Sequence, residues 1–241
     1  LASMHRIHLS PSSFVCPTYS SHINNWHGHI PFACDLVYYT KPSLIVELGV
    51  HFGDSYFTFC QAVKEFNLNT NCIGIDNWQG DEQTGFYDGN VFNKVQNYNN
   101  DNYVQFSRFI KKDFDDALKL IDDESVDILH IDGCHKKENI SHDFNNWIHK
   151  VKDNGFVLLH DIIINRQDFG VYQFWEEIHS DYPSYSFFHS CGLGIIQKNN
   201  EPKFSLGEIS FDHSDISIKD HYLYHSLRVA QFTNTPNSHV T

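Results

Sequence analysis

Features that would mark a membrane, secreted or nucleic-acid-binding protein are missing from this sequence. No stretch of its 241 residues approaches the roughly 18 consecutive apolar residues of a membrane span, and no signal-peptide pattern opens it. The six cysteines include no C-x-x-C pair, and the 17 histidines fall into no zinc-ligand spacing. Basic residues are also scarce, since 17 Lys and Arg against 30 Asp and Glu give a net charge of −13. We therefore expect a soluble cytoplasmic protein with reduced thiols, no membrane span and no nucleic-acid partner.

Apolar and aromatic residues, by contrast, are plentiful enough for a folded core. Hydrophobic residues make up 41% of the chain and aromatic residues 15%, which excludes a wholly disordered protein. The length leaves room for one large domain, or for one domain and a tail, because domains typically span about 50 to 250 residues.

Short β-branched, apolar runs alternate with helix-length segments along the chain. Strands are predicted at 44–48, 72–76, 105–110, 126–131 and 156–160, and helices at about 54–66, 90–99, 113–121, 138–151 and 170–180. Because crossovers between parallel strands are right-handed, this alternation predicts an α/β, Rossmann-like, doubly wound sheet. Two further runs, 184–188 and 193–197, predict a terminal antiparallel hairpin that brings the mostly parallel sheet to seven strands.

The turn after the first strand is the first candidate binding element, since ligands of open α/β sheets bind beyond the carboxyl ends of the strands. Gly49 and Gly53 permit a tight turn that lets the backbone approach a ligand, and Ser55 lies near a helix start. Their spacing does not match the G-x-G-x-x-G fingerprint of dinucleotide-binding proteins. An ordinary strand-to-helix connection is the alternative.

Acidic residues follow the second and third strands. Asp76 is placed where a carboxylate can accept the hydroxyls of a ribose, although a capping or solvent-facing role remains open. Asp113 either caps the next helix or lines an adenine slot together with Phe114.

The fourth and fifth strands each end in an acid and a histidine. These pairs are Asp132 with His135, and His160 with Asp161. Since adjacent strand ends meet in one crevice, we expect the four side chains to converge there. A histidine can take a hydroxyl proton, and a carboxylate can orient that histidine or bind a divalent cation. For either histidine alone, packing or a backbone hydrogen bond is an equal alternative.

Taken in order, these motifs resemble the class I S-adenosylmethionine-dependent methyltransferases, and more narrowly the subgroup found beside or fused to glycosyltransferases in glycan synthesis. The resemblance covers about residues 20–197 and implies a C-terminal domain of a larger glycan-building protein, such as a chlorovirus multidomain glycosyltransferase. The matching runs are Ser21–Trp26, Gly28–Ala33, Glu47–Ser55, Asp76–Glu82, Asp132–His135 with Asp143 and Trp147, Gly155–Asp161, Asp168–Glu177 and Cys191–Gly194.

The resemblance also implies a division of the chain. Residues 20–198 are expected to form the methyltransferase domain. Residues 1–19 are expected to be an N-terminal extension that starts with a cloning remnant, Leu1–Met4, and residues 199–241 a polar cap or tail with one short helix near 218–231.

For the site, the resemblance implies an O-methyltransferase that acts on a sugar hydroxyl, with His135 as base and Asp132 and His160 as its catalytic partners. The cofactor, S-adenosylmethionine, is expected to contact Glu47, Gly49, Gly53, Asp54, Ser55, Asp76, Asn77, Asp113, Phe114 and Asp132. The carbohydrate acceptor is expected to contact Trp78, Asp81, Glu82, Phe86, Tyr87 and Asp161. Fused or associated glycosyltransferase domains are the expected partners.

A metal requirement stays open, because the chain departs from the metal-dependent relatives. Those enzymes surround magnesium with an Asp, and with a second Asp that is followed by Asp or Asn. Here Asp132 and Asp161 are present, but Ile162 follows. The alternatives are a divalent-cation-dependent enzyme for small phenolic acceptors and a catalytically idle module that positions a glycosyltransferase. A nicotinamide-dependent oxidoreductase is disfavoured by the glycine spacing.

Overall fold

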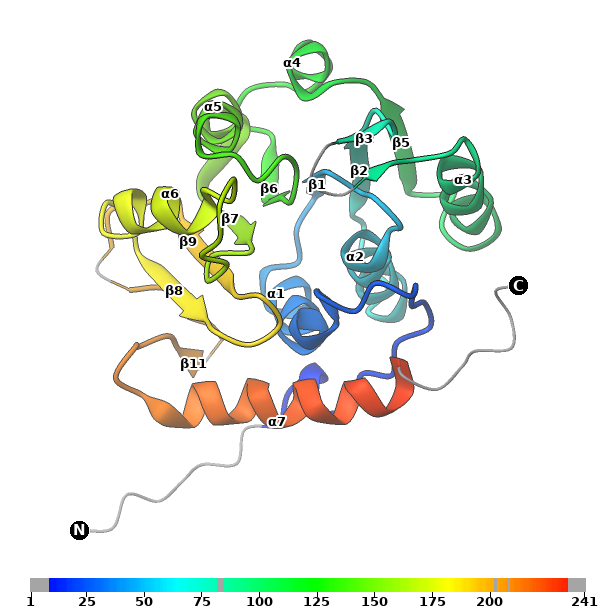
Figure 1. Ribbon diagram of the computed structural model, residues 1–241. Coiled ribbons are helices and arrows are strands. Elements are labelled where there is room, and N and C mark those ends of the chain that lie inside the picture. Colours follow the sequence, from blue (N-terminus) through cyan, green and yellow to red (C-terminus); the bar gives the residue numbers. More distant parts are fainter. Residues whose placement is uncertain (1–8, 82–84, 202, 208, 234–241) are drawn as a thin grey trace, which may run out of the picture.

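A computed structural model describes residues 9–81, 85–201, 203–207 and 209–233. A seven-stranded sheet runs through its centre (Figure 1). In chain order the strands of this sheet are β1 (Leu44–Leu48), β2 (Asn71–Asp76), β5 (Ser107–Lys111), β6 (Val126–Ile131), β7 (Val151–His160), β8 (Ser184–Phe187) and β9 (Leu193–Gln197). Two small hairpins lie apart from it, β3 (Gly80–Asp81) with β4 (Gly85–Phe86) and β10 (Ser205–Leu206) with β11 (Ile209–Ser210).

The order of strands across the sheet is β5, β2, β1, β6, β7, β9, β8. All pairs from β5 to β7 are parallel, whereas β9 runs antiparallel to both β7 and β8. From β1 the chain builds outward to one side, and it then returns to build the other side from β6. The predicted doubly wound sheet with a terminal antiparallel hairpin is confirmed, and its switch point lies between β1 and β6.

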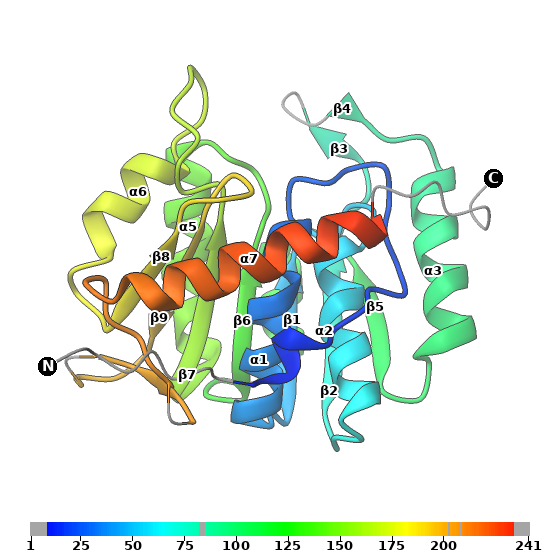
Figure 2. The same ribbon diagram turned by 90° about the horizontal axis from the view of Figure 1, so that it is seen from below.

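Helices cover both faces of the sheet, because alternate residues of each buried strand point to opposite faces (Figure 2). On β1, Ile45 packs into a core shared with α1, α2, α3 and α7, while Val46 packs into a second core with α4, α5 and α6. The helices are α1 (Ile30–Thr40), α2 (Asp54–Glu65), α3 (Asn90–Asn102), α4 (Phe114–Ala117), α5 (Lys137–Trp147), α6 (Val171–Ile178) and α7 (Ile216–Thr233), with 3₁₀ turns at Pro11–Ser13, His27–His29, Leu118–Leu120 and Ile148–Lys150.

Several parts of the fold differ from the sequence-based expectation, among them the small hairpins β3–β4 and β10–β11, which were not predicted. Helix α1 was not predicted. Strand β7 already begins at Val151, the last residue of the predicted helix 138–151. The short helix expected near 218–231 is the 18-residue helix α7.

The segments before and after the main domain meet on α1. The buried carboxylate of Asp35 on α1 accepts hydrogen bonds from the Ser10 hydroxyl (2.9 Å), the Ser12 backbone N–H (2.8 Å) and the Tyr222 hydroxyl of α7 (2.8 Å). Residues 203–233, expected as a cap or tail, therefore pack on the domain, and Phe204 and Phe211 lie in the core beside α1.

A search of the described residues finds no helix that is both long enough and apolar enough to cross a bilayer.

Candidate active site

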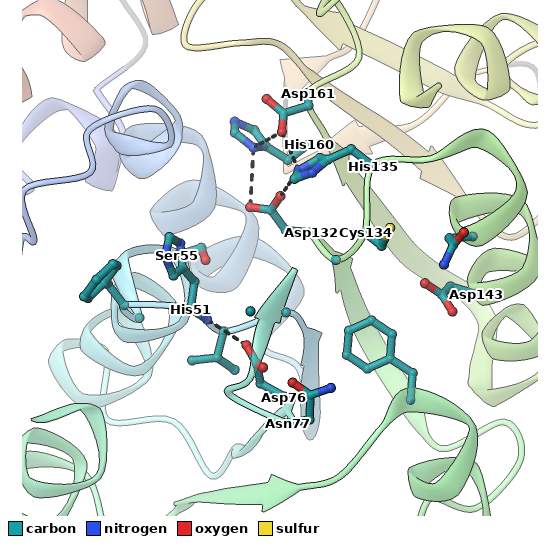
Figure 3. A pocket seen from close by; sticks show the side chains of 18 of the residues that line it. His51, Ser55, Asp76, Asn77, Asp132, Cys134, His135, Asp143, His160 and Asp161 are labelled. Carbon is teal, nitrogen blue, oxygen red and sulfur yellow. Dashed lines mark hydrogen bonds and ion pairs between the residues drawn. The ribbon is translucent and has the colours of Figure 1, made fainter. Parts of the chain in front are cut away.

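A cavity of about 440 Å³ opens beyond the carboxyl ends of the parallel strands. The loops after β1, β2, β5, β6 and β7 form its walls, together with α5 and residues 23–26 (Figure 3). Its volume falls within the range of about 300–1,000 Å³ that is typical of small-molecule sites. The strand ends named in the sequence analysis thus meet around one cavity.

The loop after β1 has the conformation needed to approach a ligand closely. Gly49 (φ +87°) and Gly53 (φ +90°) adopt left-handed backbone angles that favour glycine. A Cβ on Gly49 would stand 2.1 Å from the carbonyl oxygen of Asp132, so no other residue fits there. The loop and the ends of β1 and β6 therefore form a tight cradle that a ligand can approach closely.

Asp76 lies at the end of β2 and faces this loop. Its carboxylate accepts backbone N–H bonds from His51 (3.0 Å) and Trp78 (2.7 Å), and burial raises its pKa. The side chain also lines the cavity, which fits the expected ribose contact. Next to it, Asn77 donates its amide N–H to Asp113 at 2.7 Å.

Asp113 takes the extended N-cap backbone conformation before α4, but its side chain makes no capping hydrogen bond. Both Asp113 and Phe114 line the same cavity as Asp76. The two residues expected to contact adenine are therefore near the residue expected to contact the ribose.

Glu47, expected to bind the cofactor, lies beneath the loop and does not line the cavity. It is fully buried and accepts hydrogen bonds from Ser55 (2.8 Å) and from Nδ1 of His130 (2.9 Å). Because Nε2 of His130 accepts the indole N–H of Trp26 (3.2 Å), Nδ1 carries the proton that it donates to Glu47. Both Glu47 oxygens are thus engaged within the protein. Its role is to tie the loop to the N-terminal segment.

Asp54, at the start of α2, holds the N-terminal segment over the cavity. It accepts hydrogen bonds from the backbone N–H (2.7 Å) and the hydroxyl (2.5 Å) of Ser21, and it contacts Nε2 of His27 at 2.7 Å. The side chain lines the cavity, but its oxygens are already used by residues 21 and 27. We assign it to fastening this segment.

The four residues at the ends of β6 and β7 converge as expected. Nε2 of His135 lies 2.8 Å from Asp161 and 3.7 Å from Asp132. Nδ1 of His160 lies 3.4 Å from Asp132 and 3.6 Å from Asp161, while its Nε2 donates to the carbonyl oxygen of Ser190 at 3.0 Å. Both imidazoles therefore face the same two carboxylates.

Charge compensation within this cluster shifts its pKa values. Burial lowers the pKa of His135, but Asp132 and Asp161 outweigh it and raise that pKa to about 10. The pKa of His160 rises to about 9, since the nearby carboxylates again outweigh burial. Burial acts to raise the pKa of Asp132, yet His160 and His135 hold it well below its usual value. At neutral pH both imidazoles of the cluster are therefore protonated.

The same cluster contains a donor set that suits a divalent cation. One ligand atom each from Asp132, His135 and Asp161 lies within 4.8 Å of the others. Two carboxylates and one imidazole are acceptable ligands for cations such as Mn²⁺ or Zn²⁺. A cation there would replace one proton of His135, the proton on Nε2, because a metal-bound imidazole is neutral.

Of the residues expected to bind the acceptor, some line the cavity and others lie away from it. Tyr87 lines the cavity, and its ring stacks on His51 with centroids 4.8 Å apart and an interplanar angle of 12°. Trp78 does not line the cavity, because its side chain is 4% exposed and packs in the core against Phe92 and Phe109. Phe86 is 79% exposed and is not among the residues that line the cavity.

Two more of the expected acceptor contacts, Asp81 and Glu82, cannot be assigned to the site. Asp81 pairs with Gly85 in the β3–β4 hairpin through its backbone, and Glu82 lies outside the described residues.

Sequence reasoning assigned no site role to one wall of the cavity, although Asp143 was among the residues that matched the family motifs. Asn139, His142 and Asp143 line it from α5. Their spacing of i, i+3 and i+4 places them on one helix face, which is the signal that could have identified them.

Residues 46–162 match a family described as "Methyltransferase domain". This part of the chain is therefore a methyltransferase domain. The enzyme class and cofactor that the sequence indicated, a methyltransferase that uses S-adenosylmethionine, are confirmed. The glycine cradle and Asp76 are the features of this domain that fit the cofactor.

Among relatives, the chain is 45% identical over 171 residues to the uncharacterized protein y4gI of Sinorhizobium fredii. The match covers 71% of this chain but only 19% of y4gI, so the chain spans about a fifth of that protein's length.

Two solved structures share the fold. The methyltransferase PaMTH1 of Podospora anserina, bound to S-adenosylhomocysteine, has 12% identity and a TM-score of 0.54, over 76% of this chain and 80% of PaMTH1. The O-methyltransferase TomG of Streptomyces achromogenes, in complex with S-adenosylmethionine, has 13% identity and a TM-score of 0.54, over 78% of this chain and 94% of TomG.

Proposed function

We propose that this domain transfers the methyl group of S-adenosylmethionine to a hydroxyl oxygen of a sugar within a glycan. The observation that carries the proposal is the cluster of Asp132, His135, His160 and Asp161 beside the glycine cradle. Asp132 lines the same cavity as the glycine cradle, which would hold the cofactor at the ends of β1 and β6.

S-adenosylmethionine supplies an electrophilic methyl group when it is bound. Transfer breaks the bond between sulfur and the methyl carbon and forms a bond to the acceptor oxygen, which loses its proton. We assign His135 as the base that receives this proton, with Asp132 orienting the acceptor or the imidazole. His160, fixed by the Ser190 carbonyl, forms the second arm of the cluster. Because the carboxylates keep His135 protonated at neutral pH, it must release one proton before it can act.

A sugar acceptor is supported by the aromatic wall of the cavity. The stacked rings of His51 and Tyr87 offer an apolar face, while Asp161 and Asp132 offer hydrogen-bond acceptors for hydroxyl groups. TomG is described as an O-methyltransferase, which agrees with an oxygen acceptor.

Glycosyltransferase domains are the partners that we propose, in keeping with the glycan-associated motifs and with the length of y4gI beyond the matched part. We place the enzyme in the cytoplasm, since all six cysteines are free and thiols stay reduced there.

Calorimetric titration of the metal-stripped chain with S-adenosylhomocysteine, and in parallel with reduced nicotinamide cofactor, tests the cofactor. We expect binding of the first alone, in the micromolar range. Incubation with S-adenosylmethionine and a panel of glycans, followed by hydrolysis and mass spectrometry, then tests the acceptor. Sugar methyl ethers support the proposal, whereas methylation of phenols alone contradicts it.

A second candidate, a divalent-cation-dependent O-methyltransferase, is favoured by the convergent ligand atoms of Asp132, His135 and Asp161. Activity that is lost on chelation and restored by added Mg²⁺ or Mn²⁺ would support it. Full activity of the chelated enzyme would favour the metal-independent histidine base.

A further inference from the structure

Two segments that lie far apart in the sequence meet beside His160. The first is the 3₁₀ turn His27–His29, directly before α1, and the second is the turn 188–192 between β8 and β9. They approach so closely that a Cβ on Gly28 would lie 2.0 Å from the hydroxyl oxygen of Ser190. The reaction proposed above gives neither segment a role of its own.

The carbonyl oxygen of Ser190 connects these two segments to the reactive cluster. It accepts the Nε2–H of His160 at 3.0 Å and the Nε2–H of His29, also at 3.0 Å. A carbonyl oxygen has two lone pairs, so it can accept both bonds at once. With its Nε2 held in this way, His160 directs its Nδ1 toward Asp132 and Asp161 (Figure 3).

His29 is fully buried and has a single ring proton to donate. Burial and the neighbouring His160 hold the pKa of His29 well below its usual range, so its imidazole is neutral. Because a carbonyl oxygen can only accept, the proton of His29 lies on Nε2. Its Nδ1 is buried and has no hydrogen-bond partner among the described residues. The hydrogen bond to Ser190 therefore decides the tautomer of this side chain.

The turn that carries this carbonyl has an unfavourable backbone conformation. Ser190 (φ +48°), Cys191 (φ +67°) and Gly192 (φ +85°) all adopt left-handed angles, which residues with a Cβ rarely take. Such conformations persist where the surrounding structure holds them in place. The backbone N–H of Asp161 holds the carbonyl of Gly192 at 3.1 Å. At the carbonyl of Ser190, this support comes from His29.

We propose that His29 is a positioning residue for the methyl transfer: by holding the Ser190 carbonyl, it fixes the orientation of His160 against the carboxylates of the cluster. This role rests on the proposed function, in which His160 forms the second arm of that cluster. Without the N–H of His29, the carbonyl can move with its turn, and His160 loses its fixed acceptor. Since His29 is not among the residues that line the cavity, its loss should slow the transfer without weakening cofactor binding.

Two substitutions separate the hydrogen bond of His29 from the packing of its ring. His29→Phe removes the donor but keeps a flat ring beside His160 and His189, whose ring centroids lie 5.6 Å and 4.9 Å away. His29→Gln keeps an N–H donor at the end of a side chain of similar reach. With S-adenosylmethionine and a glycan acceptor, we expect His29→Phe to lower kcat about tenfold or more and to change the KM for S-adenosylmethionine no more than about twofold. His29→Gln should restore kcat to within about threefold of the wild type.

His189→Phe is the matched control. Nε2–H of His189 donates to the carbonyl oxygen of Gly28 at 3.1 Å, so it joins the same two segments in the opposite direction. That carbonyl is not the one that holds His160, and kcat is expected to stay within about twofold of the wild type. Equal losses in His29→Phe and His189→Phe, or no recovery in His29→Gln, would show that His29 only holds the fold and would overturn its positioning role.

NMR of protein with ¹⁵N-labelled histidines gives a second readout, which does not need turnover. In the wild type we expect the proton of His29 on Nε2, and slow exchange of the His160 Nε2–H with water. This exchange should become about tenfold faster in His29→Phe and stay unchanged in His189→Phe. A wild-type His29 protonated on Nδ1 would overturn the proposal even if His29→Phe fails to fold. If these NMR results are obtained but no acceptor is methylated, the proposed function is wrong and the link between His29 and His160 stands.

Discussion

At one end of the cavity, Asp132, His135, His160 and Asp161 compensate one another's charges, whereas Asp143 at the other end has no such partner among the described residues. In the four-residue cluster, His135 pairs with Asp161 and His160 pairs with Asp132. Of the residues described, only His142 and Asp115 act on the Asp143 carboxyl group, through their charges. Buried charge therefore has two different environments in this cavity. In the cluster, opposite charges hold protons in place for chemistry, whereas Asp143 has no opposite charge bound to it within the described part of the chain.

Of the changes considered, removal of the His135 side chain from the charge-compensated cluster should have the largest effect on activity. We expect His135→Ala to lower kcat by about 10²- to 10⁴-fold, because proton removal from the acceptor would lose its base. Affinity for S-adenosylhomocysteine should change by no more than a few fold. Steady-state kinetics and calorimetry check the two expectations. Near-normal turnover would remove His135 from the base role, and the matched change His142→Ala at the other end should leave kcat nearly unchanged.

The pH dependence of kcat/KM for the metal-stripped enzyme tests the protonation of His135 in the charge-compensated cluster. Because the pKa of His135 is raised to about 10, only about one molecule in a thousand has the imidazole free to accept a proton at pH 7. We expect kcat/KM to rise about tenfold per pH unit above pH 7 and to level off near that pKa. A plateau that begins at pH 7 in this metal-stripped enzyme would contradict His135 as the base.

Asp143→Asn tests whether the uncompensated end destabilises the free protein. Folding raises the pKa of this acid from 3.8 to about 7, so its ionised form is disfavoured in the native state. The resulting destabilisation is absent below pH 4, grows as pH rises, and is complete above about pH 7. We expect the variant to exceed the wild type in free energy of unfolding by about 2 to 4 kcal/mol at pH 8 and by little at pH 4. Urea unfolding at both values checks this, and an equal difference at both would contradict it.

The smallest effect is expected between the two ends, at Asp76. Asp76→Ala removes the expected ribose acceptor and should weaken S-adenosylhomocysteine binding about tenfold, with a smaller change in kcat. Calorimetry measures the affinity. Unchanged affinity would show that Asp76 only holds the backbone of His51 and Trp78.

The strand ends were readable in the sequence because a parallel sheet fixes where they meet. Once β6 and β7 were recognised as neighbouring strands, Asp132, His135, His160 and Asp161 had to lie close together. Short aromatic stretches were less informative. Trp78 and Tyr87 belong to the same expected loop, yet one packs in the core and the other lines the cavity.

For Glu47 on the first strand, the sequence could not predict where the side chain points. The family resemblance implied a cofactor contact for Glu47, but the direction of this side chain depends on His130, which lies 83 positions later in the sequence and binds it. No local pattern contains that information. The helix α1 was missed for a related reason: its first eight residues are all buried, so no clear polar face alternates with an apolar one.

By itself, the sequence determined the doubly wound sheet, the glycine turn and the set of polar residues at the strand ends, because periodicity and strand order act locally and follow fixed handedness rules. Only the tertiary structure decided which charges are compensated and which are not. That outcome depends on distances between side chains from separate elements, such as the 2.8 Å between His135 and Asp161, and on the absence of any such neighbour around Asp143 among the described residues.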